Sequence, residues 1–295
     1  MISSFKELLE YAKLSGPKRI ALAGGADPVA VAALKLAVKD NLIKDPILVG
    51  EKEKIEKLGI EPVCRQAGFE IVDTPAEEAP VEAAKLVKEG VASIIMKGKV
   101  TTSAFLKGIL SELRTDKRLS HMAVLESPFY HKLLLMTDGG MNINPDLEVK
   151  IDILTNGIEF AHKIGIKCPK VAILAAVETV NPDMPETVDA QELAEMAQDG
   201  KFGECVVEGP LALDLAVSKE ACQIKGIESK IAGDADMLIV PSVIVGNIAA
   251  KSMVYLGNCK IAGVVLGALA PVIMLSRADT QETKIRSIAL GIAGI

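Results

Sequence analysis

The stretch that decides the fold is RIALAGGADPVAVAALKLAVK, residues 19–39. Its first five residues form a short apolar run that ends at Gly24-Gly25, and residues 28–39 then place apolar side chains at helical spacing. Further strand candidates follow at residues 47–49, 69–72 and 93–96. Because strand and helix patterns alternate in this way, the sequence predicts an α/β fold with a mostly parallel sheet and right-handed crossovers.

The pattern changes after a polar stretch at residues 114–118. Two apolar segments, residues 122–125 and 132–136, lie close together and precede the turn-rich segment TDGGMN at residues 137–142. Such spacing predicts antiparallel or irregular pairing and a second domain. Strand patterns resume at residues 170–176 and 237–240, so the second domain is also expected to be α/β.

Composition excludes several classes of protein. The chain has 295 residues, of which 49% are hydrophobic and only 3% aromatic, so it can bury a large core of mostly Ala, Val, Ile and Leu. A net charge of −6 argues against a nucleic-acid surface, which needs clustered Lys and Arg. Any anionic ligand is therefore expected to be held locally.

The cysteines and the apolar runs predict a cytoplasmic location. The five cysteines are widely spaced without any C-x-x-C pair, which disfavours a disulfide framework and a zinc site. Residues 1–18 contain no apolar region of the signal-peptide kind. The longest apolar run, residues 261–275, contains Pro271 and is shorter than the ~20 residues needed to cross a bilayer. We expect no membrane span and interpret this run as a buried strand and its continuation.

A polar segment, SRADTQETK at residues 276–284, follows that run at the start of a predicted helix. Unpaired N–H groups at a helix N-terminus favour an anion, and the Arg277 guanidinium suits phosphate or carboxylate. An alternative interpretation is a capping box formed by Asp279 and Glu282. In that case only Ser276 and Arg277 would remain without a structural explanation.

A second segment, KGKVTTSAFLK at residues 97–107, is also expected to lead from a strand into a helix. Gly98 permits close backbone approach, and Thr101 or Thr102 can cap the helix. Positive charge comes from Lys97, Lys99 and Lys107, so a second anion site is predicted. It is not a Walker A loop, because Ser93 occupies the position of the first Gly. The alternative is an ordinary capped helix with solvated lysines.

A third strand–loop–helix segment contains Gly246, Asn247 and Lys251. Asn247 and Lys251 are four residues apart and would share one helical face, although Asn247 alone is also typical of a cap. Asp234 and Asp236 suggest either a metal site or a turn before a strand, and the turn is the commoner case. The three histidines have no metal-ligand spacing.

Taken together, these segments resemble the phosphate acetyltransferase and phosphate butyryltransferase family over nearly the whole chain. The ordered family pattern of strand, Pro, Gly-Asn, Lys, strand, Pro and Ser-Arg is matched by Pro241, Gly246, Asn247, Lys251, Pro271, Ser276 and Arg277. Resemblance to the butyryl branch is carried by His121, by YHKLL at residues 130–134 and by DGGMNIN at residues 138–144.

The resemblance implies a reversible transfer of a butyryl or similar short acyl group between coenzyme A and phosphate. No metal or bound cofactor is implied, since coenzyme A or acyl-CoA and phosphate or acyl phosphate are substrates. The implied fold has two α/β domains flanking a cleft, like isocitrate and isopropylmalate dehydrogenases. The first domain would be residues 1–119 plus 268–295 and the second residues 120–267. A homo-oligomer, a dimer or larger, is also implied.

The resemblance gives each candidate residue a role. Substrate binding is expected from Lys97, Gly98, Thr101, Thr102, Lys107, Gly246, Asn247 and Lys251, and catalysis from Ser276, Arg277, Asp279 and Glu282. In the acetyl branch the base lies seven residues after the Ser, where this chain has Thr283. The base is therefore Asp279 or Glu282, with Asp279 favoured by its nearness to Ser276. The alternatives are a metal- and NAD-dependent decarboxylating dehydrogenase and a noncatalytic CoA-binding protein.

Overall fold

The computed structural model describes residues 2–58, 68–276 and 279–295. Its contacts divide the chain into two compact units. The first unit contains Lys6–Lys117 and Ala262–Ile295, and the second contains Met1–Phe5 and Arg118–Ile261. Both units combine helices with a sheet, so the predicted α/β class is confirmed. The domain bounds at residues 119 and 267 stay a prediction.

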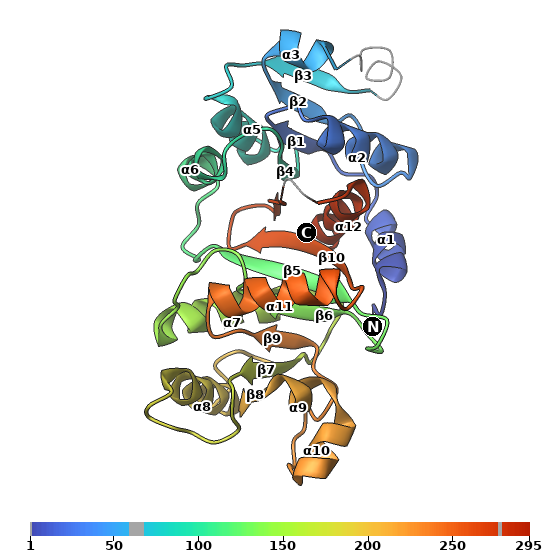
Figure 1. Ribbon diagram of the computed structural model, residues 1–295. Coiled ribbons are helices and arrows are strands. Elements are labelled where there is room, and N and C mark those ends of the chain that lie inside the picture. The colour runs from blue at the N-terminus through green and yellow to red at the C-terminus, as the bar shows by residue number, and fades with distance from the viewer. Residues whose placement is uncertain (1, 59–67, 277–278) are drawn as a thin grey trace. The chain divides into compact units, whose positions relative to one another are not determined.

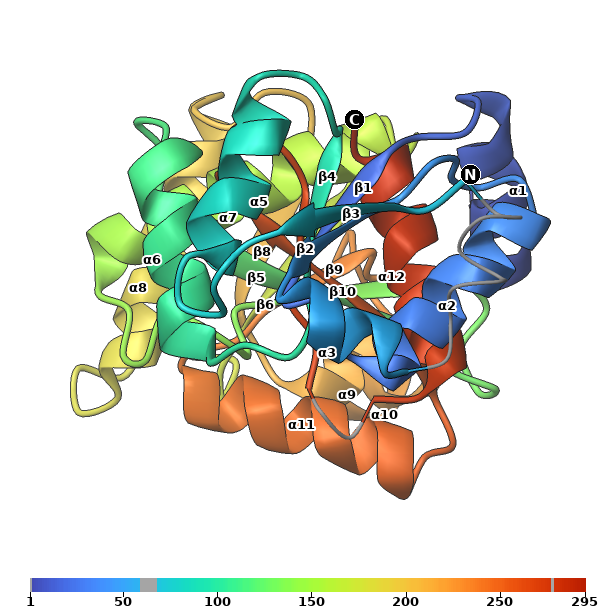
Figure 2. The ribbon, with the colours of Figure 1, turned by 90° about the horizontal axis from the view of Figure 1, so that it is seen from above.

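The first unit is a sheet with helices on both faces. Its strand order is β3-β2-β1-β4-β11-β10, and every pair is parallel except β10 with β11. Helices α5 and α6 pack on one face, and α2 and α12 pack together on the other (Figure 1, Figure 2). The elements are α1 (Phe5–Leu14), β1 (Ile20–Ala23), α2 (Pro28–Lys39), β2 (Ile47–Gly50), α3 (Lys52–Glu56), β3 (Glu70–Asp73), α5 (Ala79–Lys88), β4 (Ile94–Lys97), α6 (Thr102–Glu112), β10 (Lys260–Leu266), β11 (Val272–Ile273) and α12 (Gln281–Ala293).

The apolar run at residues 261–275 forms two strands, where the sequence suggested one strand and its continuation. Gly267 adopts a φ of 88°, which favours glycine, and Pro271 has no N–H to donate to a sheet. The chain therefore turns between them, and Val265 on β10 pairs with Val272 on β11 in an antiparallel register. This turn brings β11 next to β4, directly before the polar segment at residue 276.

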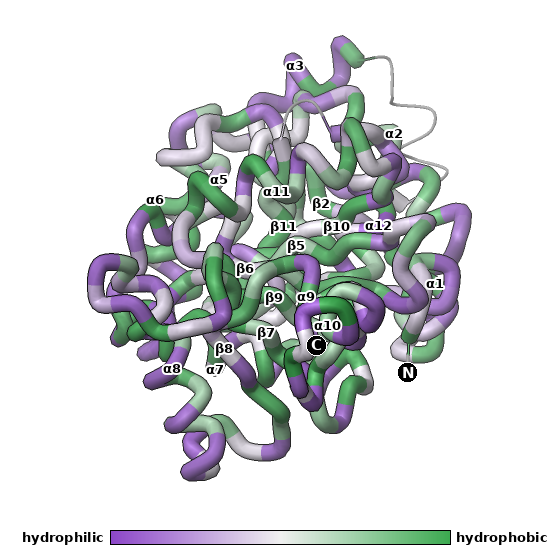
Figure 3. Tube along the Cα trace, turned by 60° about the horizontal axis from the view of Figure 1, so that its bottom comes forward, coloured by the Kyte–Doolittle hydropathy of each residue, from purple (hydrophilic) through white to green (hydrophobic). Residues whose placement is uncertain are grey.

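The second unit has the strand order β5-β6-β9-β7-β8. Strand β5 pairs antiparallel with β6, as its spacing predicted, and the other pairs are parallel. Figure 3 shows hydrophobic residues along β5, β6 and β9. The elements are β5 (Ser120–Glu126), β6 (Leu134–Thr137), α7 (Leu147–Lys163), β7 (Lys170–Leu174), α8 (Pro185–Gln198), β8 (Val206–Leu211), α9 (Leu213–Val217), α10 (Lys219–Lys225), β9 (Met237–Ile239) and α11 (Val243–Tyr255).

The expectation of an isocitrate/isopropylmalate dehydrogenase-like fold is wrong beyond the α/β class. The sheets are mixed, because β5 is antiparallel to β6 and β10 is antiparallel to β11. Repeated strand–helix patterns indicate only that elements alternate along the chain. Which strands become neighbours depends on contacts between distant segments, which those patterns do not contain.

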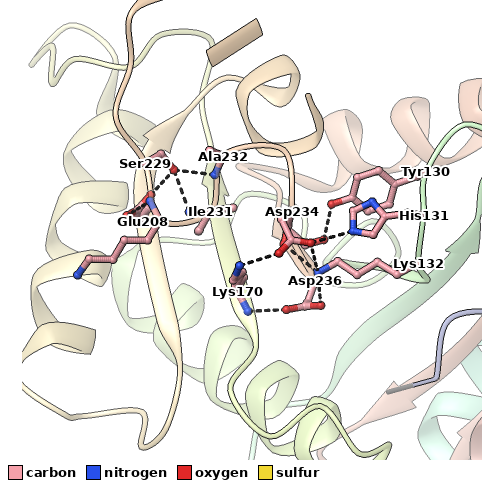
Figure 4. A network of polar contacts seen from close by, with 12 residues as sticks. Tyr130, His131, Lys132, Lys170, Glu208, Ser229, Ile231, Ala232, Asp234 and Asp236 are labelled. Carbon is pink, nitrogen blue, oxygen red and sulfur yellow. Dashed lines mark hydrogen bonds and ion pairs between the residues drawn. The ribbon is translucent and has the colours of Figure 1, made fainter. Parts of the chain in front are cut away.

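An ion network joins the amino ends of β6, β9 and β7 (Figure 4). The buried Lys132 ammonium lies 2.6 Å from Asp236 Oδ1 and donates to the Asp234 carbonyl at 2.9 Å. The Lys170 ammonium lies 2.6 Å from Asp234 Oδ2, and His131 Nε2 lies 2.8 Å from Asp234 Oδ1. The two carboxylates therefore bind cationic side chains and link three neighbouring strands, which favours the interpretation of this segment as a structural turn.

Candidate active site

The carboxyl edge of the first unit's sheet collects three loops that lead into helices. Strands β1, β4 and β11 are parallel, with Ala23 paired to Lys97 and Ile273 to Met96, so all three end at the same edge. Ligands in open α/β sheets bind outside this edge, where helix N-termini carry unpaired N–H groups. The helices that begin there are α2, α6 and α12, with side-chain caps from Asp27, Thr101 and Thr280.

Gly98 allows the loop after β4 to touch the loop after β1. Its N–H donates to the Ala23 carbonyl at 2.8 Å, and the Lys99 N–H donates to the Gly24 carbonyl at 2.9 Å. A Cβ on Gly98 would lie only 2.4 Å from the Gly24 oxygen. The close approach that the sequence predicted at Gly98 is thus to the protein's own backbone. It fixes Lys97, the half-buried last residue of β4, at the sheet edge.

The start of α6 resolves which threonine is the cap. Thr101 Oγ1 accepts a hydrogen bond from the Ala104 N–H at 3.2 Å, and Thr102 is the first helical residue. Both threonines and Lys107 are exposed. The Thr102 side chain and the Lys107 ammonium are thus accessible to a ligand, while the Thr101 hydroxyl is engaged by the helix.

Ser276 and Asp279 form a closed turn before α12. The Asp279 carboxylate accepts the Ser276 N–H at 2.6 Å, and the Asp279 N–H donates to the Ser276 carbonyl at 3.1 Å. Ser276 is exposed and Asp279 half-buried. Arg277 lies outside the described residues. The turn fixes the backbone of Ser276 and holds a carboxylate next to it.

The predicted capping box is wrong, because the cap of α12 is Thr280. Its Oγ1 accepts the Thr283 N–H at 3.3 Å, and the two hydroxyls are also 3.3 Å apart. The exposed Glu282 carboxylate accepts its own backbone N–H and the Thr280 hydroxyl, which lowers the pKa of that carboxyl below its usual value. Asp279 is therefore released from capping and is engaged with Ser276 instead.

In the second unit a buried carboxylate shapes the loop after β6. Asp138 accepts the N–H groups of Gly140 and Met141 at 2.8 Å each, and it also accepts the Asn142 side-chain amide at 2.7 Å. The His121 N–H donates to it at 3.1 Å. The sequence predicted a turn in this segment but not the anchoring role of Asp138. An Asp followed by two glycines was the signal that could have indicated it.

Gly246 and Asn247 contact this loop from α11. A Cβ on Gly246 would lie 2.7 Å from the Gly139 Cα, and the Asn247 amide donates to the Gly139 carbonyl at 3.3 Å. The cap of α11 is Ser242, so the interpretation of Asn247 as a cap is wrong. Asn247 and Lys251 lie one turn apart on the helix, and both are exposed.

The candidate residues thus form two groups, each within one unit. The group in the first unit contains Lys97, Gly98, Thr101, Thr102, Lys107, Ser276, Asp279 and Glu282. The group in the second unit contains Gly246, Asn247 and Lys251. Across the described ranges, no set of three or more His, Cys, Asp and Glu side chains could hold a metal ion. Within the same ranges no helix is long and apolar enough to cross a membrane.

Comparison with known proteins identifies the class. The chain is 42% identical to phosphate butyryltransferase of Clostridium acetobutylicum, covering 98% of this chain and 97% of that protein. It is 40% identical to phosphate acetyltransferase of Thermotoga maritima, covering 97% of each. The solved structure of a branched-chain phosphotransacylase from Enterococcus faecalis V583 matches with a TM-score of 0.83 and 35% identity, over 94% of this chain and 98% of that chain.

These relatives define an enzyme class, the phosphate acyltransferases, and this protein is one of them. The model of the family described as Phosphate acetyl/butaryl transferase matches residues 64–292, and the chain belongs to that family. The fold is accordingly that of phosphotransacylases, which replaces the expected dehydrogenase-like arrangement. The family resemblance carried by the ordered motifs is confirmed.

Proposed function

We propose that the enzyme transfers butyryl or a similar short acyl group reversibly between coenzyme A and inorganic phosphate. Acyl-CoA and phosphate give acyl phosphate and coenzyme A. The observation that carries the proposal is the 42% identity to a phosphate butyryltransferase over almost the full length of both chains. Neither alternative, a metal- and NAD-dependent dehydrogenase or a noncatalytic CoA-binding protein, has comparable support.

The chemistry assigns roles at the carboxyl edge of the first unit's sheet. In the acyl phosphate direction, the thiolate of coenzyme A attacks the acyl carbon, a C–S bond forms, and the C–O bond to phosphate breaks. A thiol with an ordinary pKa of ~8.5 is mostly protonated at neutral pH, so a carboxylate that removes the proton assists the attack. The proton then leaves with the base or with the departing phosphate.

Asp279 is the base in this proposal, and Glu282 is the alternative. Asp279 is half-buried and hydrogen bonded to the Ser276 N–H, so it lies beside the proposed reaction centre. Glu282 is exposed, and hydrogen bonds from its own backbone N–H and the Thr280 hydroxyl lower the pKa of its carboxyl, so it takes up a proton less readily than an ordinary glutamate. Ser276 would donate its hydroxyl to the oxyanion of the tetrahedral intermediate, and single donors of this kind contribute ~2.7–4 kcal/mol elsewhere.

The remaining residues bind substrate in the proposal. Arg277 orients phosphate, a role that rests on the sequence pattern alone. Lys97, Gly98, Thr101, Thr102 and Lys107 bind anionic groups at the start of α6, and Gly246, Asn247 and Lys251 bind substrate at α11. Coenzyme A enters as a substrate, and no bound cofactor takes part in this scheme.

We also propose a homo-oligomer, a dimer or larger, as the resemblance to the family implies. Light scattering on the native protein tests this proposal. A native mass equal to that of a monomer would contradict it.

The proposed activity is tested by release of free thiol from acetyl-CoA, butyryl-CoA and branched acyl-CoAs, with and without phosphate. We expect release only with phosphate, and the highest kcat/KM for butyryl or a branched chain. A change of absorbance at the nicotinamide band with a hydroxy acid would support the dehydrogenase instead. Binding of coenzyme A without turnover would support a noncatalytic protein.

A further inference from the structure

Two free cysteines lie at the same end of neighbouring strands in the second unit, although they are far apart in the sequence. Cys168 comes two residues before the start of β7, and Cys205 directly precedes β8. The two strands are parallel neighbours, with Lys170 paired to Val206. Both cysteines therefore lie at the amino edge of the sheet.

Hydrogen bonds hold the backbone beside each cysteine. The Val206 N–H donates to the Pro169 carbonyl at 3.0 Å, so the residues that directly follow the two cysteines are joined to each other. Before Cys205, His162 Nε2 in the last turn of α7 lies 3.0 Å from the Glu204 carbonyl oxygen. The backbone segments that carry the two thiols are thus fixed relative to each other.

The spacing of the two cysteines suits a disulfide. Neighbouring strands lie ~4.8 Å apart, and each residue adds ~3.3 Å along a strand. In the register of Lys170 with Val206, Cys168 is one position out of line with Cys205, which corresponds to a Cα separation of ~6 Å. Disulfides join Cα atoms that are ~4.4–6.8 Å apart.

The two side chains are not held to opposite faces of the sheet, since neither residue belongs to a strand. Cys168 lies in a bend and Cys205 follows one, so the alternation of a continuous strand does not apply. The Cys205 thiol turns back toward the Gly203 carbonyl, at 3.6 Å. Burial raises the pKa of this thiol, and the charge of a Cys168 thiolate raises it further, so the two sulfur atoms lie within electrostatic reach of each other.

The two thiols differ in their access to solvent. Cys168 is exposed and Cys205 is half-buried, whereas Cys222 and Cys259 are buried. Among the described cysteines, Cys168 is therefore the one that a reagent in solution meets first. An accessible thiol with a second thiol beside it is the usual arrangement of a redox-sensitive pair.

We propose that Cys168 and Cys205 form a reversible disulfide by exchange with the disulfide of a small thiol. The Cys168 thiolate attacks one sulfur of the small disulfide, which forms a mixed disulfide and releases one small thiolate. Cys205 then loses its proton and attacks the Cys168 sulfur, which forms the intrachain bond and releases the second small thiol. The two cysteines lose two electrons in total, and the small disulfide gains them. The new bond links β7 to β8, the edge strand of this sheet.

Glutathione disulfide added to the native protein tests the proposal. We expect the number of thiols titrated after unfolding to fall by two, the intact mass to fall by two hydrogen atoms, and peptide mapping to join Cys168 to Cys205. Dithiothreitol should restore the original mass. In Cys205→Ser the second step is blocked, so Cys168 should keep one glutathione. In Cys168→Ser the half-buried Cys205 should react at least about 10-fold more slowly.

Cys259→Ala, which removes a buried thiol outside the pair, is the matched control and should form the same disulfide. On oxidation the thermal midpoint of the native protein should rise by roughly 5 °C, because the bond closes a long loop. A midpoint that falls would show that the bond forms only by distorting the strands, and would overturn the proposal. So would a native protein that stops at glutathione adducts, joins other cysteines or links two chains. Peptide mapping of the native protein decides even if a variant does not fold.

Discussion

At the scale of single residues, hydrogen bonds with Asp279 hold Ser276 through its backbone. Asp279 accepts its N–H and donates to its carbonyl, so Ser276→Ala should keep the turn and lose only the hydroxyl. We expect kcat to fall ~10²–10³-fold with little change in KM for coenzyme A, because the hydroxyl acts on the oxyanion. Steady-state kinetics measure both constants. A near-native kcat would reduce Ser276 to a structural residue.

Asp279 and Glu282 lead to different predictions for the pH dependence of kcat/KM. Asp279→Asn can still accept the Ser276 N–H but cannot take a proton, so the acidic limb of kcat/KM with acyl phosphate and coenzyme A should disappear. If Glu282 were the base, its lowered pKa would place the acidic limb below the ordinary range of a glutamate, and Glu282→Gln would abolish it. An acidic limb that survives in both variants, with most activity, would exclude both residues.

Several features of the site could be predicted from residue types alone. A threonine cap for α6, either Thr101 or Thr102, and the placement of Asn247 and Lys251 on one helix follow from local spacing. The engagement of Asp279 could not be predicted, because Thr280 competes for the same helix end and the two differ by one position. The hydrogen bond from the His121 N–H to Asp138 could not be predicted, because it forms through the antiparallel pairing of β5 with β6.

At the scale of elements, the contact between the loops after β1 and β4 depends on Gly98. Gly98→Ala would bring a Cβ within 2.4 Å of the Gly24 oxygen, so the loop must shift and take Lys97 with it. We expect a loss of about 1–3 kcal/mol in the free energy of unfolding, together with reduced activity. Urea denaturation and thiol-release assays measure the two effects.

Gly291→Ala is the matched control for this change. Gly291 lies inside α12, and an added Cβ would meet neighbours at an ordinary 3.6 Å. Because alanine favours a helix over glycine, this variant should be as stable as the native protein or gain up to ~1 kcal/mol. Equal stabilities of the two variants would contradict the proposed packing role of Gly98.

The ion network at the amino ends of β6, β9 and β7 makes stability depend on pH. Partial burial alone would raise the pKa of the Asp234 carboxyl, but hydrogen bonds from Lys170, Lys132 and His131 outweigh it and hold the pKa well below its usual value. A carboxyl whose pKa is lowered by folding stabilises the native state at pH values above 3.8, which is its pKa in the unfolded chain. That stabilisation is lost as the pH falls toward the pKa of the folded state.

We therefore expect the free energy of unfolding to decline between about pH 5 and pH 2, and the decline to be weaker in Asp234→Asn. Asp152→Asn is the control, since its pair with Arg118 is exposed and contributes under about 1 kcal/mol. Urea denaturation at several pH values measures the slopes. Identical slopes in the native protein and in Asp234→Asn would show that the network does not stabilise the fold.

Most elements of the first unit's sheet could be predicted from local pattern, since β1, β2, β3 and β4 match apolar runs that end at turn residues. Strand β8 was missed, because it contains Gly209 and Pro210, which are uncommon in strands. The division of residues 261–275 into two strands was also missed, although Gly267 and Pro271 are the residues that cause it. Gly and Pro inside an apolar run can either end a strand or lie within it, and the position of the neighbouring strand is needed to decide.

At the scale of the whole molecule, the α/β class and the family followed from the order of motifs, whereas the arrangement of strands did not. Strand β11 has only two residues, and its pairing with β4 joins positions far apart in the chain. A pairing of this kind is decided by which apolar surfaces fit together, and the hydrophobic pattern of one strand is compatible with several neighbours. The solved phosphotransacylase structure supplies the correction.

The central claim is that an acyl group passes from coenzyme A to phosphate. The most direct measurement follows free thiol and acyl phosphate together, with butyryl-CoA as substrate and hydroxylamine added to trap acyl phosphate as the hydroxamate. After subtraction of the direct reaction of hydroxylamine with butyryl-CoA, measured without enzyme, we predict one hydroxamate for each thiol released when phosphate is present, and no enzyme-dependent product without phosphate. Thiol release without phosphate, or without a matching amount of hydroxamate, would identify a hydrolase and contradict the account.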